Sequence, residues 1–576
     1  MGSESKTGSS SAKPFGGGKA AQSAPSIASK SSKGAEASLH APSTHNMATI
    51  VDDDDRLLTR IGYTPVLQRH FSRWSTVSYA ISILGVLGSV PATFGSPVGS
   101  GGPATAVWAW MIGSIMAYCI ASSVAELVSA YPTAGGMYYV TKHVVPKDRV
   151  APWAWIVGWC NFLGQAGGVA SLAYTISQMI LATAVMHSIE DSNGVPTFHP
   201  TSVQTVLLAI LVLCLFGAIC SFPTLWLHKV ILWFAPINSK CSFRLLLASI
   251  AICIALLVLT PEKQSAKWVF TEFTDGSGWG SKGFSFLLGF LSVAWTMTDY
   301  DGTTHMSEET HDAAIRGPVA IRAAILVSGV VGWMLTVTFC FCMSDYEGIM
   351  ATPTGLPVAQ IFLNAGGRTG GTVMWFFVIL VQFFTGCSAM LANSRMAWAF
   401  ARDAAFPFSD FWAKVNNVTD TPINAVWLVV IFCSCLNMIG IGSTLTILSI
   451  FNITAPALDI SYIAVIVAHR WYEGKVQFHP GPYTMGRWSK PVNAIAVTWV
   501  CFISVILFFP TVRPVTATNM NYAICVAAFI GFFSMIWWYA GARKRYTGPR
   551  TTDMIDELPQ EDARDIVADS TAFYEP

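Results

Sequence analysis

The chain has 576 residues, of which 53% are hydrophobic and only 12% are charged. Soluble domains carry about 25% charged residues, so a chain this apolar requires the lipid bilayer as its solvent. The net charge of +1 provides no overall field that would attract nucleic acid, and we expect no nucleic-acid partner. The 13 cysteines show no CxxC motif and no metal-ligand spacing, so we predict neither a metal site nor another cofactor.

The two ends of the chain contain no membrane span. Residues 1–46 are rich in Ser, Ala, Gly and Lys and lack the apolar core of a secretory signal, so we predict a mostly disordered tail over residues 1–73. Met47 is an alternative start of translation. Residues 544–576 are predicted to form a second tail, which leaves residues 74–543 as the membrane domain.

A membrane span needs about 20 apolar residues. The segment from Trp74 to Ala125 contains no charged residue. It is long enough for two spans separated by the glycine-rich turn at 99–103. Further spans are predicted near 153–186, 202–221, 241–260, 284–304, 318–343, 372–400, 423–440, 444–468, 491–511 and 520–541. The predicted total is twelve.

The first and sixth spans are interrupted. The first carries glycines and a proline within residues 85–91, and the sixth runs into two carboxylates and a glycine within residues 295–302. Unwound backbone survives at membrane depth only when it is buried in protein or lines a cavity. Interrupted spans at matching positions in two repeats indicate the binding site of a transporter.

The charges of the loops predict the orientation in the membrane. If both termini are cytosolic, the short cytosolic loops hold fifteen Lys and Arg residues and the outer loops hold five. Positive charge is retained on the cytosolic side, so we predict that both termini are cytosolic. We expect the plasma membrane in preference to an internal membrane.

Four segments resemble motifs of the amino acid–polyamine–organocation superfamily of transporters. Residues 125–138 are similar to its Glu…Pro-x-x-Gly-Gly signature, and residues 56–63, 299–309 and 394–403 resemble segments of the fungal amino acid/choline permeases, which include GABA and choline permeases. The four occur in the expected order on a twelve-span chain. One departure is the charged, Trp-containing stretch 225–244 before the fifth span.

The resemblance implies an all-α integral membrane protein with a fold like that of the bacterial leucine transporter. Spans one to five and six to ten form inverted repeats in that fold, and helices 1 and 6 are discontinuous. The implied function is secondary active transport of a small amino acid or amine, such as GABA or choline, by alternating access. The resemblance favours protons as the coupling ion. A lysine of the fifth span replaces a sodium ion in some relatives, which makes Lys240 a candidate for coupling.

The two interruptions predict a site for a small zwitterion or amine. Half-helix N-termini favour a carboxylate, so we expect Gly85, Gly88 and Ser89 to bind the substrate carboxylate through backbone amides. Unwound carbonyls and carboxylates favour an ammonium group, so we expect Thr296, Thr298 and Asp299 to face the amine. Close helix packing is the alternative role for the glycines.

Three further residues are expected beside this site. Gln165 of the third span is predicted to line it opposite the first interruption, and Trp295 and Tyr300 to close over the ligand. Packing is an equally good explanation for the two aromatic residues. For Asp299 and Asp301 the alternative is that the sixth span has already ended and both carboxylates lie in cytosolic water.

The remaining candidates concern coupling and gating. Asp301 and Asp459 are carboxylates in apolar segments. Because a carboxylate within the membrane is energetically costly, we expect both to have a function in coupling or gating. A structural polar contact is the alternative for Asp459. Glu126 is a candidate to pair with Arg395 or Arg402 in an inner gate, and simple anchoring is its alternative.

Two other classes of protein compete with a transporter. A nutrient sensor of the same fold would signal without flux, although the short tails offer no large output element. A membrane-embedded enzyme is suggested only by His305 and His311, which bracket Glu308 and Glu309. That spacing is not the HExxH of a zinc protease, and a solvated loop is the expected structure there.

Overall fold

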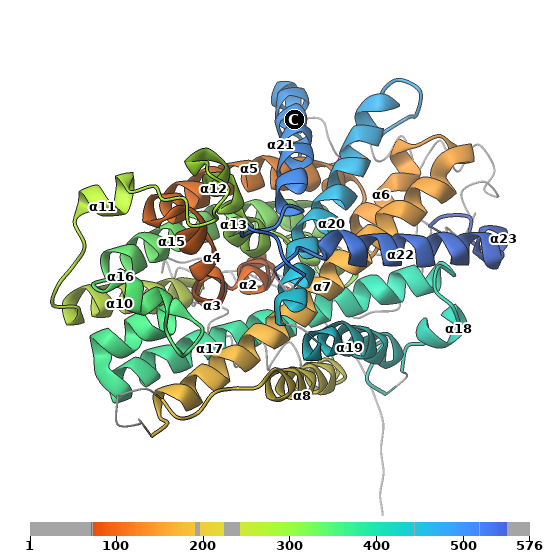
Figure 1. Ribbon diagram of the computed structural model, residues 1–576. Helices are drawn as coiled ribbons and strands as arrows, with labels where there is room; N and C mark the ends of the chain where they lie inside the picture. The colour runs from red at the N-terminus through yellow and green to blue at the C-terminus, as the bar shows by residue number, and fades with distance from the viewer. Residues whose placement is uncertain are drawn as a thin grey trace, which may run out of the picture. The chain divides into compact units, whose positions relative to one another are not determined.

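The computed structural model describes residues 71–549 except 72, 190–195, 224–241, 417, 443 and 518. The described residues form helices and isolated bridges without a strand (Figure 1). The predicted all-α fold class is therefore confirmed. Most of both tails, Lys240 and most of the stretch before the fifth span lie outside the described residues.

The longer helices are α2 (Arg73–Leu84), α3 (Val86–Thr93), α5 (Pro103–Ala130), α6 (Gly136–Val144), α7 (Val150–Met186), α8 (Ser202–Cys220), α10 (Ser242–Leu259), α15 (Ala313–Phe341), α17 (Pro357–Arg402), α19 (Ile423–Met438), α20 (Thr444–Trp471), α21 (Ser489–Leu507) and α22 (Ala523–Trp537). The short ones are α4 (Gly95–Gly101), α11 (Ala266–Thr271), α12 (Lys282–Leu288), α13 (Phe290–Thr296), α14 (Gly302–His305), α16 (Tyr346–Met350), α18 (Ser409–Trp412) and α23 (Arg543–Arg545). Single turns are η1 (Lys147–Arg149), η2 (Ser307–Glu309), η3 (Ile439–Ile441), η4 (Gly486–Trp488) and η5 (Trp538–Ala542).

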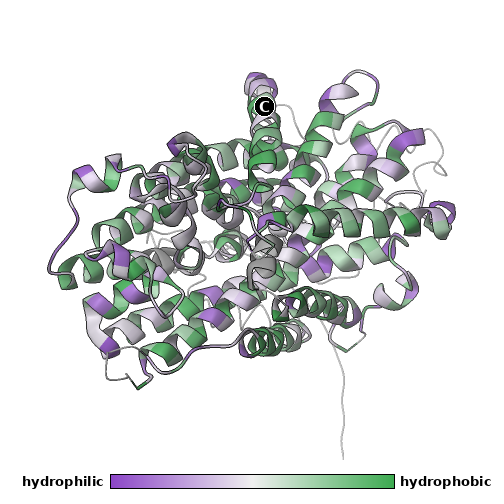
Figure 2. Cartoon of the chain, in the orientation of Figure 1, coloured by the Kyte–Doolittle hydropathy of each residue, from purple (hydrophilic) through white to green (hydrophobic). Residues whose placement is uncertain are grey.

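Among the described residues, ten helices are long and apolar enough to cross a membrane. The apolar character is continuous along helices such as α8 and α19 (Figure 2). These ten correspond to the predicted spans other than the fifth and the sixth. The fifth has a shorter apolar helix at Leu247–Leu259 within α10, and the sixth is divided among α12, α13 and α14. The structure thus contains helix in each predicted segment, but it does not confirm the count of twelve full spans.

The first and sixth spans are discontinuous, as the sequence predicts. Gly85 adopts a left-handed conformation (φ 46°, ψ 45°) and separates α2 from α3. Glycine adopts this conformation without the steric cost of a Cβ atom. In the sixth span α13 ends at Thr296 and helix resumes only at Gly302. Asp299 turns the intervening chain with φ 60°, in the region that Asp and Asn tolerate better than most residues.

Long helices pack around both interruptions. α7 lies along α17 and α20, while α5 packs against α15 (Figure 1). α3 packs against α17, and α13 packs against α5 and α20. The contact of α7 with α20 is close, because a Cβ atom on Gly164 would lie 2.8 Å from the backbone nitrogen of Leu458. Small residues at such positions allow helices to approach closely in lipid.

Candidate functional site

The interruption of the sixth span buries two carboxylates. Asp301 is fully buried and Asp299 is 8% exposed. The alternative that both lie in cytosolic water is therefore wrong. The helix ends locally because the chain turns at Asp299, and the same turn exposes backbone groups between Thr296 and Gly302 to the interior of the protein.

Several buried polar atoms at this interruption have no hydrogen-bond partner among the described residues. They are the hydroxyl groups of Thr296, Thr298 and Tyr300 and one carboxylate oxygen of Asp299, together with both side-chain amide atoms of Gln165. Buried polar atoms are normally paired, and unpaired ones cost free energy. A polar ligand that occupied this region would supply the missing partners.

One face of α7 runs along the interruption. Near one end Asn161 donates its side-chain N–H to Asp301 Oδ2 at 2.9 Å, and further along Ser171 accepts from Trp295 Nε1 at 3.0 Å. Asn161 and Ser171 are ten positions apart, which corresponds to about 15 Å of helix. Gln165 lies one turn beyond Asn161 on the same face, so α7 presents Gln165 toward the residues between Trp295 and Asp301. The lining role of Gln165 stays a prediction.

Asp301 is the most connected group of the site. Tyr462 of α20 donates its hydroxyl to Asp301 Oδ1, while Asp301 Oδ2 lies 3.4 Å from His305 Nε2. Asp459, also on α20, is buried and close enough to interact electrostatically with Asp301 and Tyr300. Asn161, Tyr462 and His305 were not among the predicted site residues. Asn161 is a polar residue in an apolar span, which is the signal that would have identified it.

The first interruption faces α17. A Cβ atom on Gly85 would overlap the side chain of Thr385, and one on Gly88 would overlap Gln382. Ser89 donates to the carbonyl of Leu84 at 3.1 Å and to Gln382 Oε1 at 3.3 Å. The packing role of the two glycines is therefore present in the structure. The backbone N–H of Gly85 donates to the carbonyl of Ile81 at 3.2 Å, and those of Gly88 and Ser89 donate to the carbonyl of Gly85 at 2.8 and 2.9 Å. The prediction that these three amides bind a carboxylate is therefore wrong, because the local helical turns already use them.

Two ion pairs lie just beyond the interruption, on η2 and α17. Arg395 Nε is 2.9 Å from Glu309 Oε1, and both side chains are almost completely buried. Arg402 lies 3.4 Å from Glu308, whose carboxylate also accepts from the backbone N–H of Ala134 at 3.1 Å. The expectation of a solvated loop at His305–Glu309 is wrong, because helix packing buries His305 and both glutamates. No metal-binding cluster is found among the described residues.

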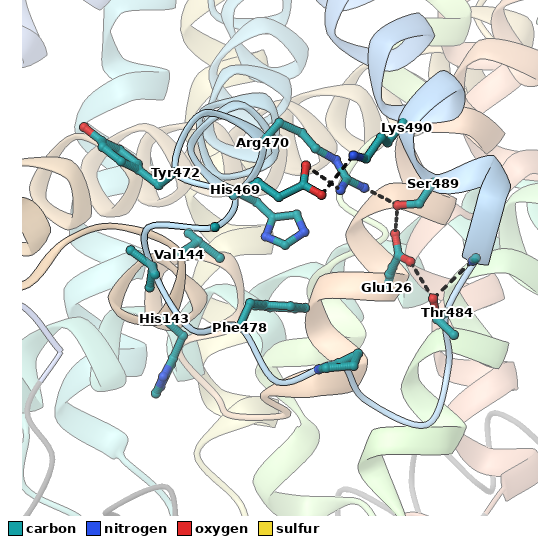
Figure 3. A pocket seen from close by; sticks show the side chains of 15 residues that line it. Glu126, His143, Val144, His469, Arg470, Tyr472, Phe478, Thr484, Ser489 and Lys490 are labelled. Carbon is teal, nitrogen blue, oxygen red and sulfur yellow. Dashed lines mark hydrogen bonds and ion pairs between the residues drawn. The ribbon is translucent and has the colours of Figure 1, made fainter.

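Glu126 does not pair with Arg395 or Arg402. Its carboxylate accepts from the hydroxyl of Thr484 at 2.9 Å, from the backbone N–H of Met485 at 3.0 Å and from the hydroxyl of Ser489 at 2.5 Å (Figure 3). The predicted pairing is wrong because α5 packs against α21, which directs its C-terminal end toward the segment before α21. Anchoring, the alternative role, is what the structure shows.

Glu126 also lines a cavity of about 380 Å³ between the ends of α6, α20 and α21 (Figure 3). Arg470, Glu473 and Lys490 contribute charged groups to its wall, and Lys490 lies 3.0 Å from Glu473. None of the residues at the two interruptions lines this cavity. It is therefore separate from the proposed substrate site.

Comparison with known proteins places the chain in a family. A profile described as amino acid permease matches residues 71–532. An uncharacterized amino-acid permease of Schizosaccharomyces pombe is 43% identical over 88% of this chain and 92% of its own length. Amino-acid permease 2 of Neurospora crassa is 36% identical over 91% of this chain and 94% of its own length. A putative polyamine transporter of Candida albicans is 32% identical over 91% of this chain and 95% of its own length. The chain belongs to the amino acid permease family, and it is a multi-pass membrane transporter rather than an enzyme.

Proposed function

We propose that this chain is a secondary active transporter that moves a small amino acid or amine, such as GABA or choline, by alternating access coupled to protons. We place both termini in the cytosol on the basis of the loop charges, and we propose the plasma membrane as its location. The observation that carries the proposal is the interruption of the sixth span at Asp299. A buried carboxylate oxygen without a partner lies there beside unpaired hydroxyl groups.

The charges at the interruption support an amine-bearing substrate. Asp299, Asp301 and Asp459 are all buried, and among the described residues no Lys or Arg forms an ion pair with any of them. Uncompensated buried charge is costly, so an ammonium group or protons would stabilise this arrangement. The name of the Candida albicans relative, a putative polyamine transporter, agrees with an amine as part of the substrate.

The partial charge at the start of α3, and not the already paired amides of Gly85, Gly88 and Ser89, supports a carboxylate at the other end of the substrate. α3 begins directly after Gly85, and the N-terminus of a helix carries partial positive charge. A zwitterion between the two interruptions would therefore place each charge against an oppositely charged group. GABA satisfies this arrangement at both ends, and choline satisfies only the amine end.

The ion pairs beyond the interruption support alternating access. Glu308 joins Arg402 on α17 to the backbone of Ala134, which lies between α5 and α6. Opening a path from the site to this side of the protein requires these contacts to separate. We propose that the cycle breaks and reforms them.

Flux into liposomes tests this function. The purified chain is reconstituted and supplied with labelled GABA, choline, putrescine and the common amino acids, with imposed pH or sodium gradients. We expect uptake of at least one compound and accumulation when the lumen is alkaline. Dependence on sodium without any effect of pH would refute proton coupling, and the absence of flux for every compound would favour a nutrient sensor.

A further inference from the structure

His305 lies between two groups that both accept hydrogen bonds. Its Nδ1 is 2.7 Å from the backbone carbonyl oxygen of Ala134, and its Nε2 is 3.4 Å from Asp301 Oδ2. The side chains of both titratable residues are completely buried. Nε2 makes no hydrogen bond with any described group, Asp301 included, and the carboxylate of Asp301 is the ionisable group within ion-pair distance of it.

The chemistry of these contacts favours one additional proton. A carbonyl oxygen only accepts, so the hydrogen of a neutral imidazole lies on Nδ1. Nε2 then presents a lone pair to a carboxylate oxygen, which is repulsive. A proton located between Nε2 and Oδ2 converts this repulsion into attraction, whether it is assigned to the imidazole or to the carboxyl group.

The other contacts of Asp301 do not provide this proton. Asn161 donates an amide N–H and Tyr462 donates its hydroxyl, and both interactions stabilise the ionised carboxylate. A hydrogen shared by Nε2 and Asp301 would therefore come from solution.

Among the residues whose side chains the structure describes, no Lys or Arg forms an ion pair with Asp301 that would replace it. α14 packs against α2, α15 and α17. Arg395 and Arg402 of α17 are paired with Glu309 and Glu308, and Arg316 at the start of α15 is paired with Asp312. The other titratable groups nearby are Tyr79 on α2, Asp299 on the interruption, and Asp459 and Tyr462 on α20. Tyr300 also lies near Asp301, and none of these groups supplies a positive charge.

We propose that Asp301 and His305 form a proton-binding site, and that the proton held there keeps the segment at 131–136 closed against the sixth span. When the proton leaves, the single remaining N–H can serve Ala134 or Asp301 but not both. If the hydrogen lies on Nε2, the carbonyl of Ala134 loses its donor. If it lies on Nδ1, the lone pair of Nε2 again points toward a carboxylate oxygen. The proton therefore controls a contact between the sixth span and the segment joining α5 to α6.

The same segment is fitted closely to His305. Gly136 adopts φ 52°, and a Cβ atom there would lie 2.6 Å from Thr304 Oγ1 and 2.9 Å from His305 Cε1. A shift of the imidazole ring is consequently transmitted to the backbone of this segment. The inference rests on the proposed function, because the coupled ion is taken to be a proton.

Hydrogen–deuterium exchange tests the site without a substrate. Peptides covering 131–138 are followed in the purified full-length protein at pH 5.5 and 8.5, with intrinsic exchange rates corrected. We expect at least fivefold faster exchange at the higher pH. In His305→Asn, whose amide N–H retains the donor to Ala134 but does not titrate, the pH difference should disappear. The matched control His187→Asn, at an exposed histidine that contacts Thr372, should behave as the wild type.

A second variant decides the question if His305→Asn does not fold. Tyr462→Phe removes a donor to the carboxylate of Asp301, so the pH midpoint of exchange should rise by roughly one unit. Absence of a pH effect in the wild type, its persistence in His305→Asn, or an unchanged midpoint in Tyr462→Phe would overturn the inference. Flux measurements separate the two proposals. If exchange at 131–138 depends on pH but uptake is not driven by protons, only the proposed function is contradicted. If uptake is driven by protons but exchange at 131–138 does not depend on pH, only this inference is contradicted.

Discussion

Arg395 and Glu309 form an ion pair from which water is excluded, with 2.9 Å between Nε and Oε1 and side-chain exposures of 0% and 1%. Removing one member of a buried pair leaves the other charge uncompensated, which costs about 3–5 kcal/mol. We expect Arg395→Gln to lower the thermal unfolding temperature in detergent strongly. Arg395→Gln combined with Glu309→Gln should recover much of the loss.

Arg316 provides the control for this prediction. It pairs with Asp312 at 2.5 Å, but the side chains are 21% and 35% exposed. Because solvent screens such pairs to about 0–1 kcal/mol, Arg316→Gln should have a small effect. An Arg395→Gln variant as stable as Arg316→Gln would contradict the role of the buried pair.

Asp299→Asn tests the proposed amine site. Asparagine tolerates the left-handed conformation of this position, so the turn is retained while the charge is removed. Loss of a hydrogen bond to a charged group costs about 1.5–3 kcal/mol, which corresponds to roughly a 10- to 150-fold rise in KM for uptake. Asp420 also has a positive φ, of 50°, and Asp420→Asn is the matched control. Unchanged rate, affinity and pH dependence in Asp299→Asn would remove this residue from the site.

Gly85→Ala tests the first interruption. The added methyl group would overlap Thr385, and the left-handed conformation adds about 1–2 kcal/mol for a residue with a Cβ atom. Overpacking contributes about 1–3 kcal/mol more, so we expect a large drop in unfolding temperature and in transport. Gly531→Ala in α22, where no atom beyond the adjoining residues and the helix's own backbone lies within 4 Å of the new atom, should be neutral or slightly stabilising. Equal behaviour of the two variants would show that the interruption is not sterically constrained.

His143 gives a prediction about pH. Burial, together with the positive charge of Lys142 and with His479, lowers the pKa of His143 to about 4, from 6.5. The unfolded chain therefore binds a proton between pH 6.5 and 4 that the folded chain does not, and stability falls as the pH falls through this window. The contribution is roughly 3 kcal/mol.

His143→Phe should flatten this dependence. Phenylalanine retains an aromatic ring against Tyr131, on which the imidazole stacks at 3.9 Å, but it does not titrate. Unfolding temperatures measured from pH 7.5 to 4.5 in detergent should decline less steeply in the variant. The same decline in both proteins would show that another group is responsible.

Single positions differ in how far the sequence predicted their roles. The interruption at Asp299 was predicted because a carboxylate in an apolar run is costly wherever the chain folds. The partner of Glu126 was predicted wrongly, since Thr484 and Ser489 lie more than 350 positions away along the chain. His305 was considered only for a metal site, because no local pattern indicates that its ring lies between Asp301 and Ala134.

The sequence by itself determined the membrane spans, the two interrupted helices and the family. Hydropathy, glycine, proline and intramembrane carboxylates act within one or two turns of helix, so their effects can be recognised without the rest of the chain. Only the tertiary structure decided which buried charges meet. Arg395 reaches Glu309 across 86 positions and Ala134 reaches Glu308 across 174, and such pairs are set by the packing of whole helices against one another.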